Sequence, residues 1–161
     1  MTKPADLGVL ISCSVPGIAR TIRMALRGMG VRRIFIALND EQLEEGFAAA
    51  EPHVLLVYVE SEAETDHGLA TLRDVRRAPD SPAPKIPVVA ISQRRDLPTI
   101  NAAMNAGAHE YVLFPVSADV LMKRILAACQ STRPFIETPE YVGPERKNVD
   151  VGKTSKASIN G

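Results

Sequence analysis

The 161-residue sequence lacks several features, and each absence excludes a class of protein. Cysteine is scarce: Cys13 and Cys129 lie far apart, and neither belongs to a CxxC or Cys/His cluster with metal-binding spacing, which is typical of a protein in a reducing, cytoplasmic setting. Net charge is absent, because 19 Lys and Arg residues balance 19 Asp and Glu residues. No overall field therefore favours nucleic acid or an anionic membrane as a partner. No apolar run is long enough to cross a bilayer, and no cleavage site follows the first residues, so we expect a cytoplasmic protein.

What the sequence does contain is a regular alternation of two apolar patterns. Short apolar runs, too short for helices, are typical of strands buried on both faces. The five runs are Leu7–Cys13, Arg32–Leu38, His53–Tyr58, Pro87–Ser92 and Tyr111–Phe114. After each run, apolar residues recur at helical spacing, and Ser14 and Ser117 are the expected N-caps of the first and last helices. This order predicts an α/β fold with a doubly wound parallel sheet.

The last part of the chain differs in composition from the rest. Residues 132–161 mix Pro, Gly, Lys and Asn with few apolar side chains, so they are too poor in hydrophobic residues to form a core. We expect a domain over residues 1–131 and an irregular C-terminal tail over 132–161 that is flexible or docked. The tail could equally be a short peptide that folds onto a partner or onto its own domain.

Several local sequences show a resemblance to a known family. They are Glu51-Pro52-His53, Gly68-Leu69, Pro87 to Ser92, Asn105 to Tyr111, and Phe114-Pro115. Over residues 7 to about 130 the chain resembles the CheY-like receiver domain of bacterial response regulators. The resemblance implies a flavodoxin-like (βα)5 fold with strand order 2-1-3-4-5.

The same resemblance implies a phosphorylation pocket at the carboxyl edge of the sheet, and this sequence departs from it. The family has an acidic pair that holds Mg²⁺, a nucleophilic aspartate, a hydroxyl and a lysine. The matching residues here are Ser12 and Cys13, Tyr58, Ser92 and Phe114. Only the hydroxyl is kept, and neutral groups are poor ligands for Mg²⁺ while a phenyl ring cannot neutralise phosphate. We therefore predict no catalytic residue, metal or cofactor, and no phosphorylation by the aspartyl mechanism.

The resemblance also implies how such a domain would signal. Ser92 and Tyr111 match the two residues that move together on activation in the family, although Tyr111 could be only a half-buried sheet residue. Contact candidates on the fourth helix, fifth strand and fifth helix are Ile100, Met104, Tyr111 and Met122. We expect a protein partner in a signalling pathway, and homodimerisation through the same face.

Other residues permit alternative hypotheses. Arg94 and Arg95 follow the fourth strand and could bind an anion, which would make the protein a small-molecule or nucleotide sensor; a solvated loop is the simpler interpretation. The acidic residues Glu60, Glu62, Glu64 and Asp66 could gather a divalent ion or form a solvated loop. Arg77 and Asp80 have the RxxD spacing of some cyclic dinucleotide sites, a pattern that is weak without structural context. The sequence Val151-Gly-Lys-Thr154 lacks the upstream glycine of a phosphate-binding loop.

Overall fold

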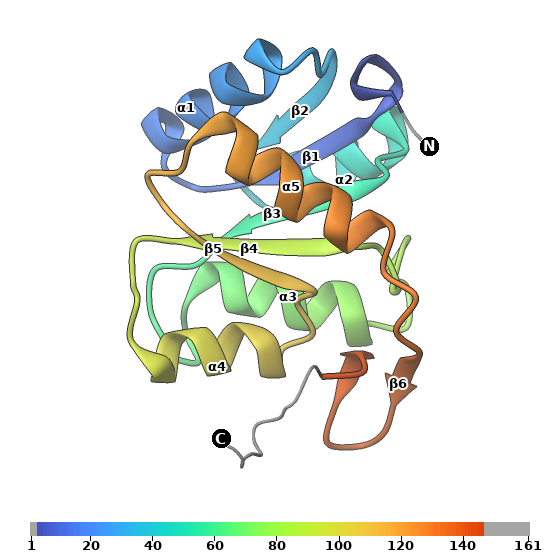
Figure 1. Ribbon diagram of the computed structural model, residues 1–161. Helices are drawn as coiled ribbons and strands as arrows, with labels where there is room; N and C mark the ends of the chain where they lie inside the picture. Colours follow the sequence, from blue (N-terminus) through green and yellow to red (C-terminus); the bar gives the residue numbers. More distant parts are fainter. Residues whose placement is uncertain (1–2, 147–161) are drawn as a thin grey trace.

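A five-stranded parallel sheet lies between two layers of helices in the computed structural model, which describes residues 3–146 (Figure 1). The strands are β1 (Gly8–Ser12), β2 (Arg33–Ala37), β3 (Val54–Tyr58), β4 (Val88–Ser92) and β5 (Glu110–Leu113). The helices are α1 (Pro16–Gly28), α2 (Asp40–Ala50), α3 (His67–Arg77), α4 (Leu97–Asn105) and α5 (Ala118–Cys129), preceded by the short 3-10 helix η1 (Pro4–Asp6). The strand order is β2-β1-β3-β4-β5, which confirms the predicted doubly wound, flavodoxin-like fold. None of the described helices is long and apolar enough to cross a membrane.

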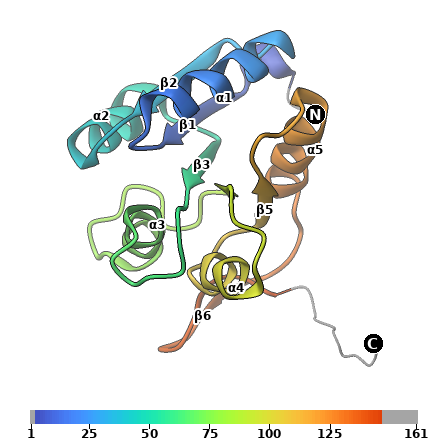
Figure 2. The same ribbon diagram turned by 90° about the vertical axis from the view of Figure 1, so that its left-hand side faces the viewer.

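The central strands β1, β3 and β4 are buried along their whole length, which explains their continuous apolar sequences. Successive side chains point to opposite faces of the sheet. Leu56 and Tyr58 therefore pack with α1 and α5, whereas Leu55 and Val57 pack with α3 and α4. Viewed from another side, α1 and α5 cover one face and α3 and α4 the other (Figure 2). The chain thus has two apolar cores divided by one sheet.

The helix starts differ in part from the predicted caps. Asn39, Asp66 and Asp96 cap α2, α3 and α4 by accepting hydrogen bonds from backbone N–H groups. The expected caps Ser14 and Ser117 do not act in this way: α1 follows Val15, and neither Val15 nor Ser117 makes a side-chain cap bond. Pro16 instead begins α1, where its missing N–H costs no helical hydrogen bond.

The first part of the predicted tail is an ordered hairpin. Strands β6 (Phe135–Glu137) and β7 (Val142–Pro144) pair antiparallel. The hairpin packs on the α4–β5 turn so closely that a Cβ on Gly107 would lie 2.5 Å from the carbonyl oxygen of Val142. Gly107 also has a φ of +113°, a conformation that favours glycine. The expectation of irregular structure is therefore wrong for residues 135–144, which are docked, and the Val151–Thr154 sequence lies outside the described residues.

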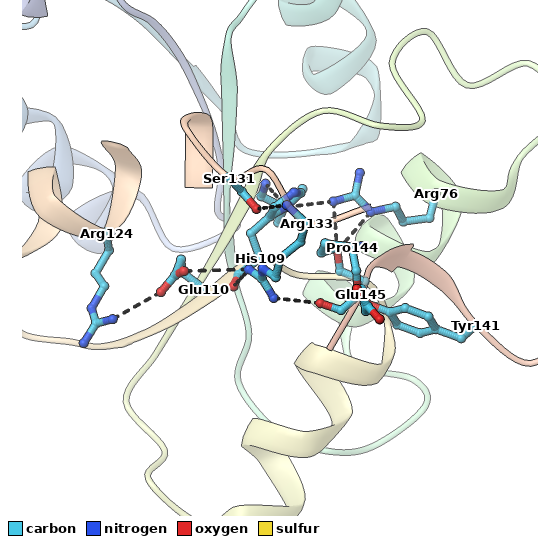
Figure 3. A network of polar contacts seen from close by, with 11 residues as sticks. Arg76, His109, Glu110, Arg124, Ser131, Arg133, Tyr141, Pro144 and Glu145 are labelled. Carbon is cyan, nitrogen blue, oxygen red and sulfur yellow. Dashed lines mark hydrogen bonds and ion pairs between the residues drawn. The ribbon is translucent and has the colours of Figure 1, made fainter. Parts of the chain in front are cut away.

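A buried arginine holds this hairpin region together (Figure 3). Arg76 is only 3% exposed and donates hydrogen bonds to the carbonyl oxygens of Gly107, Pro84 and Ile86. Its guanidinium lies 5.1 Å from the ring centre of Phe135 in β6. Burial lowers the pKa of Arg76 to about 10. The position of Arg76 at the end of α3 gives no sign of this burial in the sequence.

His109 lies beside Arg76 and is buried. Its Nδ1 accepts from the backbone N–H of Val88 at 3.2 Å and lies 3.3 Å from Nη2 of Arg76. Because two donors point at Nδ1, the ring is neutral with its proton on Nε2. Burial, together with the charges of Arg76 and Arg133, lowers the pKa of His109 to about 4.

The neighbouring Glu110 connects the hairpin region to α5. Its buried carboxylate forms ion pairs with Arg124 at 3.2 Å and with Arg133 at 3.9 Å. Arg133 also donates to the carbonyl oxygens of His109 and Glu145, which ties the segment after α5 to the start of β5 and to the chain beyond β7. This amino edge of the sheet is therefore a linked set of charged and polar groups (Figure 3).

Candidate functional site at the carboxyl edge of the sheet

The strand ends bring the five predicted pocket residues to one edge of the sheet. The register aligns Ser12 with Val57, Tyr58 with Ile91, and Ser92 with Leu113. Cys13 follows β1, and its backbone N–H donates to the carbonyl of Ala37. Phe114 follows β5, and its backbone N–H donates to the carbonyl of Ser92. In a parallel sheet all these ends lie on the carboxyl side, where open α/β folds bind ligands.

Cys13 and Tyr58 are both held in their protonated, neutral forms. The Cys13 thiol is buried and donates to the carbonyl of Val15 at 3.4 Å. Burial, and secondarily the carboxylate of Glu60, raises the pKa of the Cys13 thiol. The same two causes raise the pKa of the Tyr58 phenol, whose hydroxyl lies 3.2 Å from Oε1 of Gln93 and donates to it. Neither side chain is an activated nucleophile at neutral pH.

The donor set at this edge does not fit Mg²⁺. A hard cation requires several oxygen ligands, preferably carboxylates. Ser12 offers a buried hydroxyl, Cys13 a thiol and Tyr58 a phenol that is bonded to Gln93. Within residues 3–146 no three His, Cys, Asp or Glu side chains gather closely enough to hold a metal ion.

The acidic loop after β3 uses one of its carboxylates for its own folding. Asp66 is buried, and its two oxygens accept from the backbone N–H groups of Glu60, Ser61 and Leu69. This function of Asp66 was not predicted, although its position before α3 is typical of an N-cap. Glu62 and Glu64 are exposed, so the structure favours the solvated-loop alternative over a metal cluster.

The two predicted switch residues are linked through a single backbone residue. Ser92 is fully buried, and its hydroxyl oxygen accepts from the backbone N–H of Arg94 at 3.1 Å. The Tyr111 hydroxyl donates to the carbonyl oxygen of the same Arg94. Burial raises the pKa of the Tyr111 phenol, so the hydroxyl stays a donor. The arrangement brings Ser92 and Tyr111 to opposite sides of one loop residue.

The side chains of Arg94 and Arg95 lie in the exposed loop after β4. Arg94 donates from Nε to Oδ1 of Asp96 at 2.8 Å, and this pairing lowers the pKa of the Asp96 carboxyl to about 2. The Nε–H group of Arg94 is therefore already bonded to a carboxylate. The two residues of the RxxD pattern have separate surroundings. Arg77 donates to the carbonyl of Pro139 in the hairpin, while Asp80 lines a groove beside α2.

The predicted contact face on α4, β5 and α5 has apolar side chains at its surface. Ile100, Met104 and Tyr111 are half-buried and keep part of their surface exposed. Met122 is a correction, because it is 5% exposed and packs in the core against α1. Exposed apolar residues that the sequence analysis missed are Leu97 (69%), Leu113 (39%) and Val120 (42%). Leu113 and Val120 also line a shallow groove of about 410 Å³ between β5 and α5.

Comparisons with known proteins agree with this fold. The family model for the response regulator receiver domain matches residues 14–126. No curated protein sequence is similar enough to count as a match. Among solved structures, a response regulator from Thermotoga maritima is 22% identical, with a TM-score of 0.62 over 78% of this chain and 98% of that one.

Two further structures extend the comparison. The signal receiver domain of a modulated diguanylate cyclase from Desulfovibrio desulfuricans G20 is 26% identical, with a TM-score of 0.60 over 77% of this chain and 94% of that one. The Vibrio cholerae chemotaxis protein CheY4 is 16% identical, with a TM-score of 0.63 over 76% and 98% of the two chains. Because the family model spans most of the α/β fold described above, the chain belongs to the response regulator receiver domain family and thus to two-component signalling.

Proposed function

We propose that this receiver domain signals by protein contact and does not accept a phosphoryl group. The observation that carries the proposal is the neutral, buried phenol of Tyr58 at the end of β3, with the hydroxyl of Ser12 and the thiol of Cys13 on the neighbouring strand end. Attack on a phosphodonor by the family's mechanism requires a carboxylate at the end of β3, where Tyr58 lies, and carboxylate ligands for Mg²⁺ beside it. The domain is accordingly not an enzyme.

Incubation with a small phosphodonor and Mg²⁺, followed by intact mass measurement, tests the first half of the proposal. We expect no mass gain under conditions in which a receiver with the complete acidic pocket is phosphorylated. A stable gain of one phosphoryl group on the described domain would contradict it. Peptide mapping would then show whether the group sits on the β3–α3 loop.

The second half of the proposal concerns the surface that meets the partner. The face formed by α4, β5 and α5 carries exposed Leu97, Leu113 and Val120 next to the half-buried Tyr111. Exposed apolar side chains that cluster on one face favour a protein interface. We expect this face to bind a signalling partner.

Charge substitutions on this face separate contact from folding. L113E combined with V120E should abolish partner capture without changing the thermal unfolding midpoint, because both side chains are exposed. A49E is the matched control, since Ala49 is exposed on α2, which packs on β1 and β2 at the other end of the strand order from β5. Unchanged capture by the L113E/V120E variant would contradict the assignment of this surface.

The alternative function, an anion or nucleotide sensor at the carboxyl edge, has weaker support. Arg94 is engaged by Asp96, which leaves the exposed Arg95 as the cation offered to a ligand. Calorimetry with inorganic phosphate and nucleotides distinguishes the two functions. Heat of binding that disappears in R95A but persists in R73A would favour the sensor.

A further inference from the structure

A groove between α2 and α3 has an apolar floor and an acidic rim. It measures about 460 Å³, and Leu43, Phe47 and Val75 supply its apolar surface. Its acidic residues are Asp40, Glu41, Glu44, Asp74 and Asp80. No lysine or arginine lines it. A complementary partner therefore needs positive charges around an apolar side chain.

Helix α1 has this complementary chemistry. It contains no acidic residue, and Arg20 and Arg27 are exposed while Arg23 is partly exposed. Met24 stands among them with 72% of its surface exposed, more than any other large apolar side chain of the described chain. No ion pair within residues 3–146 involves these three arginines. At 100° per residue the three arginines lie about 40–100° to one side of Met24, so the helix presents a flexible apolar side chain beside a row of positive charges.

We propose that the α2–α3 groove of one copy of the chain receives α1 of a second copy. Met24 would enter the apolar floor, and the arginines would meet the acidic rim. From Arg20 to Arg27 the helix extends about 10 Å at 1.5 Å per residue, so all three arginines lie within about one turn of Met24. This contact is independent of the α4–β5–α5 face and goes beyond the function proposed above.

The position of the two surfaces determines the kind of assembly. Helix α1 packs on the same face of the sheet as α5, whereas α3, which borders the groove, packs on the opposite face (Figure 2). A copy cannot fill its own groove, so the contact joins two different surfaces. Contacts of this heterologous kind continue from copy to copy and do not stop at a dimer unless a ring closes. Because charge drives the contact, salt weakens it.

Sedimentation of the full chain over a concentration series tests the proposal. At low salt the average mass should rise past that of a dimer as concentration increases, and it should return to the monomer at high salt. M24E damages the α1 surface, and D74K damages the groove; both positions are exposed or at its rim, so each variant should fold and remain monomeric. R95E, a charge change at the carboxyl edge, should leave the association unchanged.

Mixing the two variants gives the decisive result. M24E keeps an intact groove and D74K keeps an intact α1, so an equimolar mixture should form a complex that stops at two chains. A native chain that stays monomeric at low salt overturns the proposal, as does a closed dimer that neither variant affects. Association lost in D74K but kept in M24E also overturns it, because another basic segment would then fill the groove. Partner capture by the L113E/V120E variant tests the proposed function separately.

Discussion

The two edges of the same sheet differ in their chemistry. At the carboxyl edge the strand ends carry neutral groups, among them Ser12, Cys13 and Tyr58, and the Tyr58 hydroxyl has one side-chain partner. At the amino edge Arg76, Glu110 and Arg133 are linked to one another through hydrogen bonds, ion pairs and the carbonyls around His109 (Figure 3). The edge where the family carries out phosphoryl transfer is thus the simpler one. The buried charges of Arg76 and Glu110 lie at the opposite end, while the buried Asp66 near the carboxyl edge bonds only to backbone N–H groups of its own loop and helix.

The largest expected effect of a substitution lies at the amino edge. R76L removes the donor for three backbone carbonyls in a buried site, and we expect a loss of about 3–5 kcal/mol in the free energy of unfolding. Urea unfolding monitored by circular dichroism measures it. R73L is the matched control on the same helix, because Arg73 makes one long bond to the Glu64 carbonyl. An equal fall in the free energy of unfolding in R76L and R73L would contradict the prediction that Arg76 stabilises the domain more than Arg73 does.

Acid should weaken the amino edge through His109. Its pKa is about 4 in the folded chain and near 6.5 when unfolded. The folded pKa is the lower one, so the stabilisation is complete above pH 6.5 and is lost as the pH falls toward 4. The loss amounts to about 3 kcal/mol for a shift of this size. The urea midpoint of H109Q should vary less across this range than that of the native chain, whereas H67Q, at an exposed histidine, should follow the native curve.

The docking of the hairpin can be broken at one glycine. G107A forces a residue with φ of +113° to carry a Cβ that would lie 2.5 Å from the Val142 carbonyl oxygen. We expect a loss of about 1–3 kcal/mol from backbone strain and displaced contacts. Limited proteolysis should then cut within residues 130–146 before it cuts the sheet. G17A is the control, because a Cβ there meets nothing within 4 Å.

The smallest effect is expected at the carboxyl edge. Y58F removes one hydroxyl bonded to the exposed Gln93, so the free energy of unfolding should fall by less than about 1 kcal/mol. Urea unfolding beside R76L compares the two edges directly. A loss as large as that of R76L would show that the carboxyl edge is also a stabilising polar network, which would end the contrast drawn above.

The sequence was sufficient to predict the parallel sheet because the three central strands are buried along their whole length. A strand apolar on both faces is distinguishable from a helix by length alone, as β3 shows. The carboxyl edge followed as well, since residues at strand ends such as Tyr58 and Ser92 are placed by the order of the parallel sheet. What the sequence could not show was the environment of each side chain at that edge.

The errors came from faces and partners that local spacing does not determine. On α5 the sequence analysis placed Met122 on the contact face, whereas the structure buries Met122 and exposes Val120. At 100° per residue, Met122 lies on the same stripe as Ile125, whereas Val120 lies well outside it, so stricter use of the helical period would have found this. The burial of Arg76 and His109 was missed for another reason: their partners are far apart in the sequence, since Phe135 lies against the Arg76 guanidinium and Arg76 lies beside His109.

The hydrogen bonds at Arg94 have an experimental consequence. Ser92 binds the amide of this residue and Tyr111 binds its carbonyl, so any rearrangement of the β4–α4 loop must disturb both side chains together. The amide of Arg94, labelled with ¹⁵N, therefore reports rearrangement of this loop. Its chemical shift would show whether binding of a partner rearranges the β4–α4 loop in the absence of a phosphodonor.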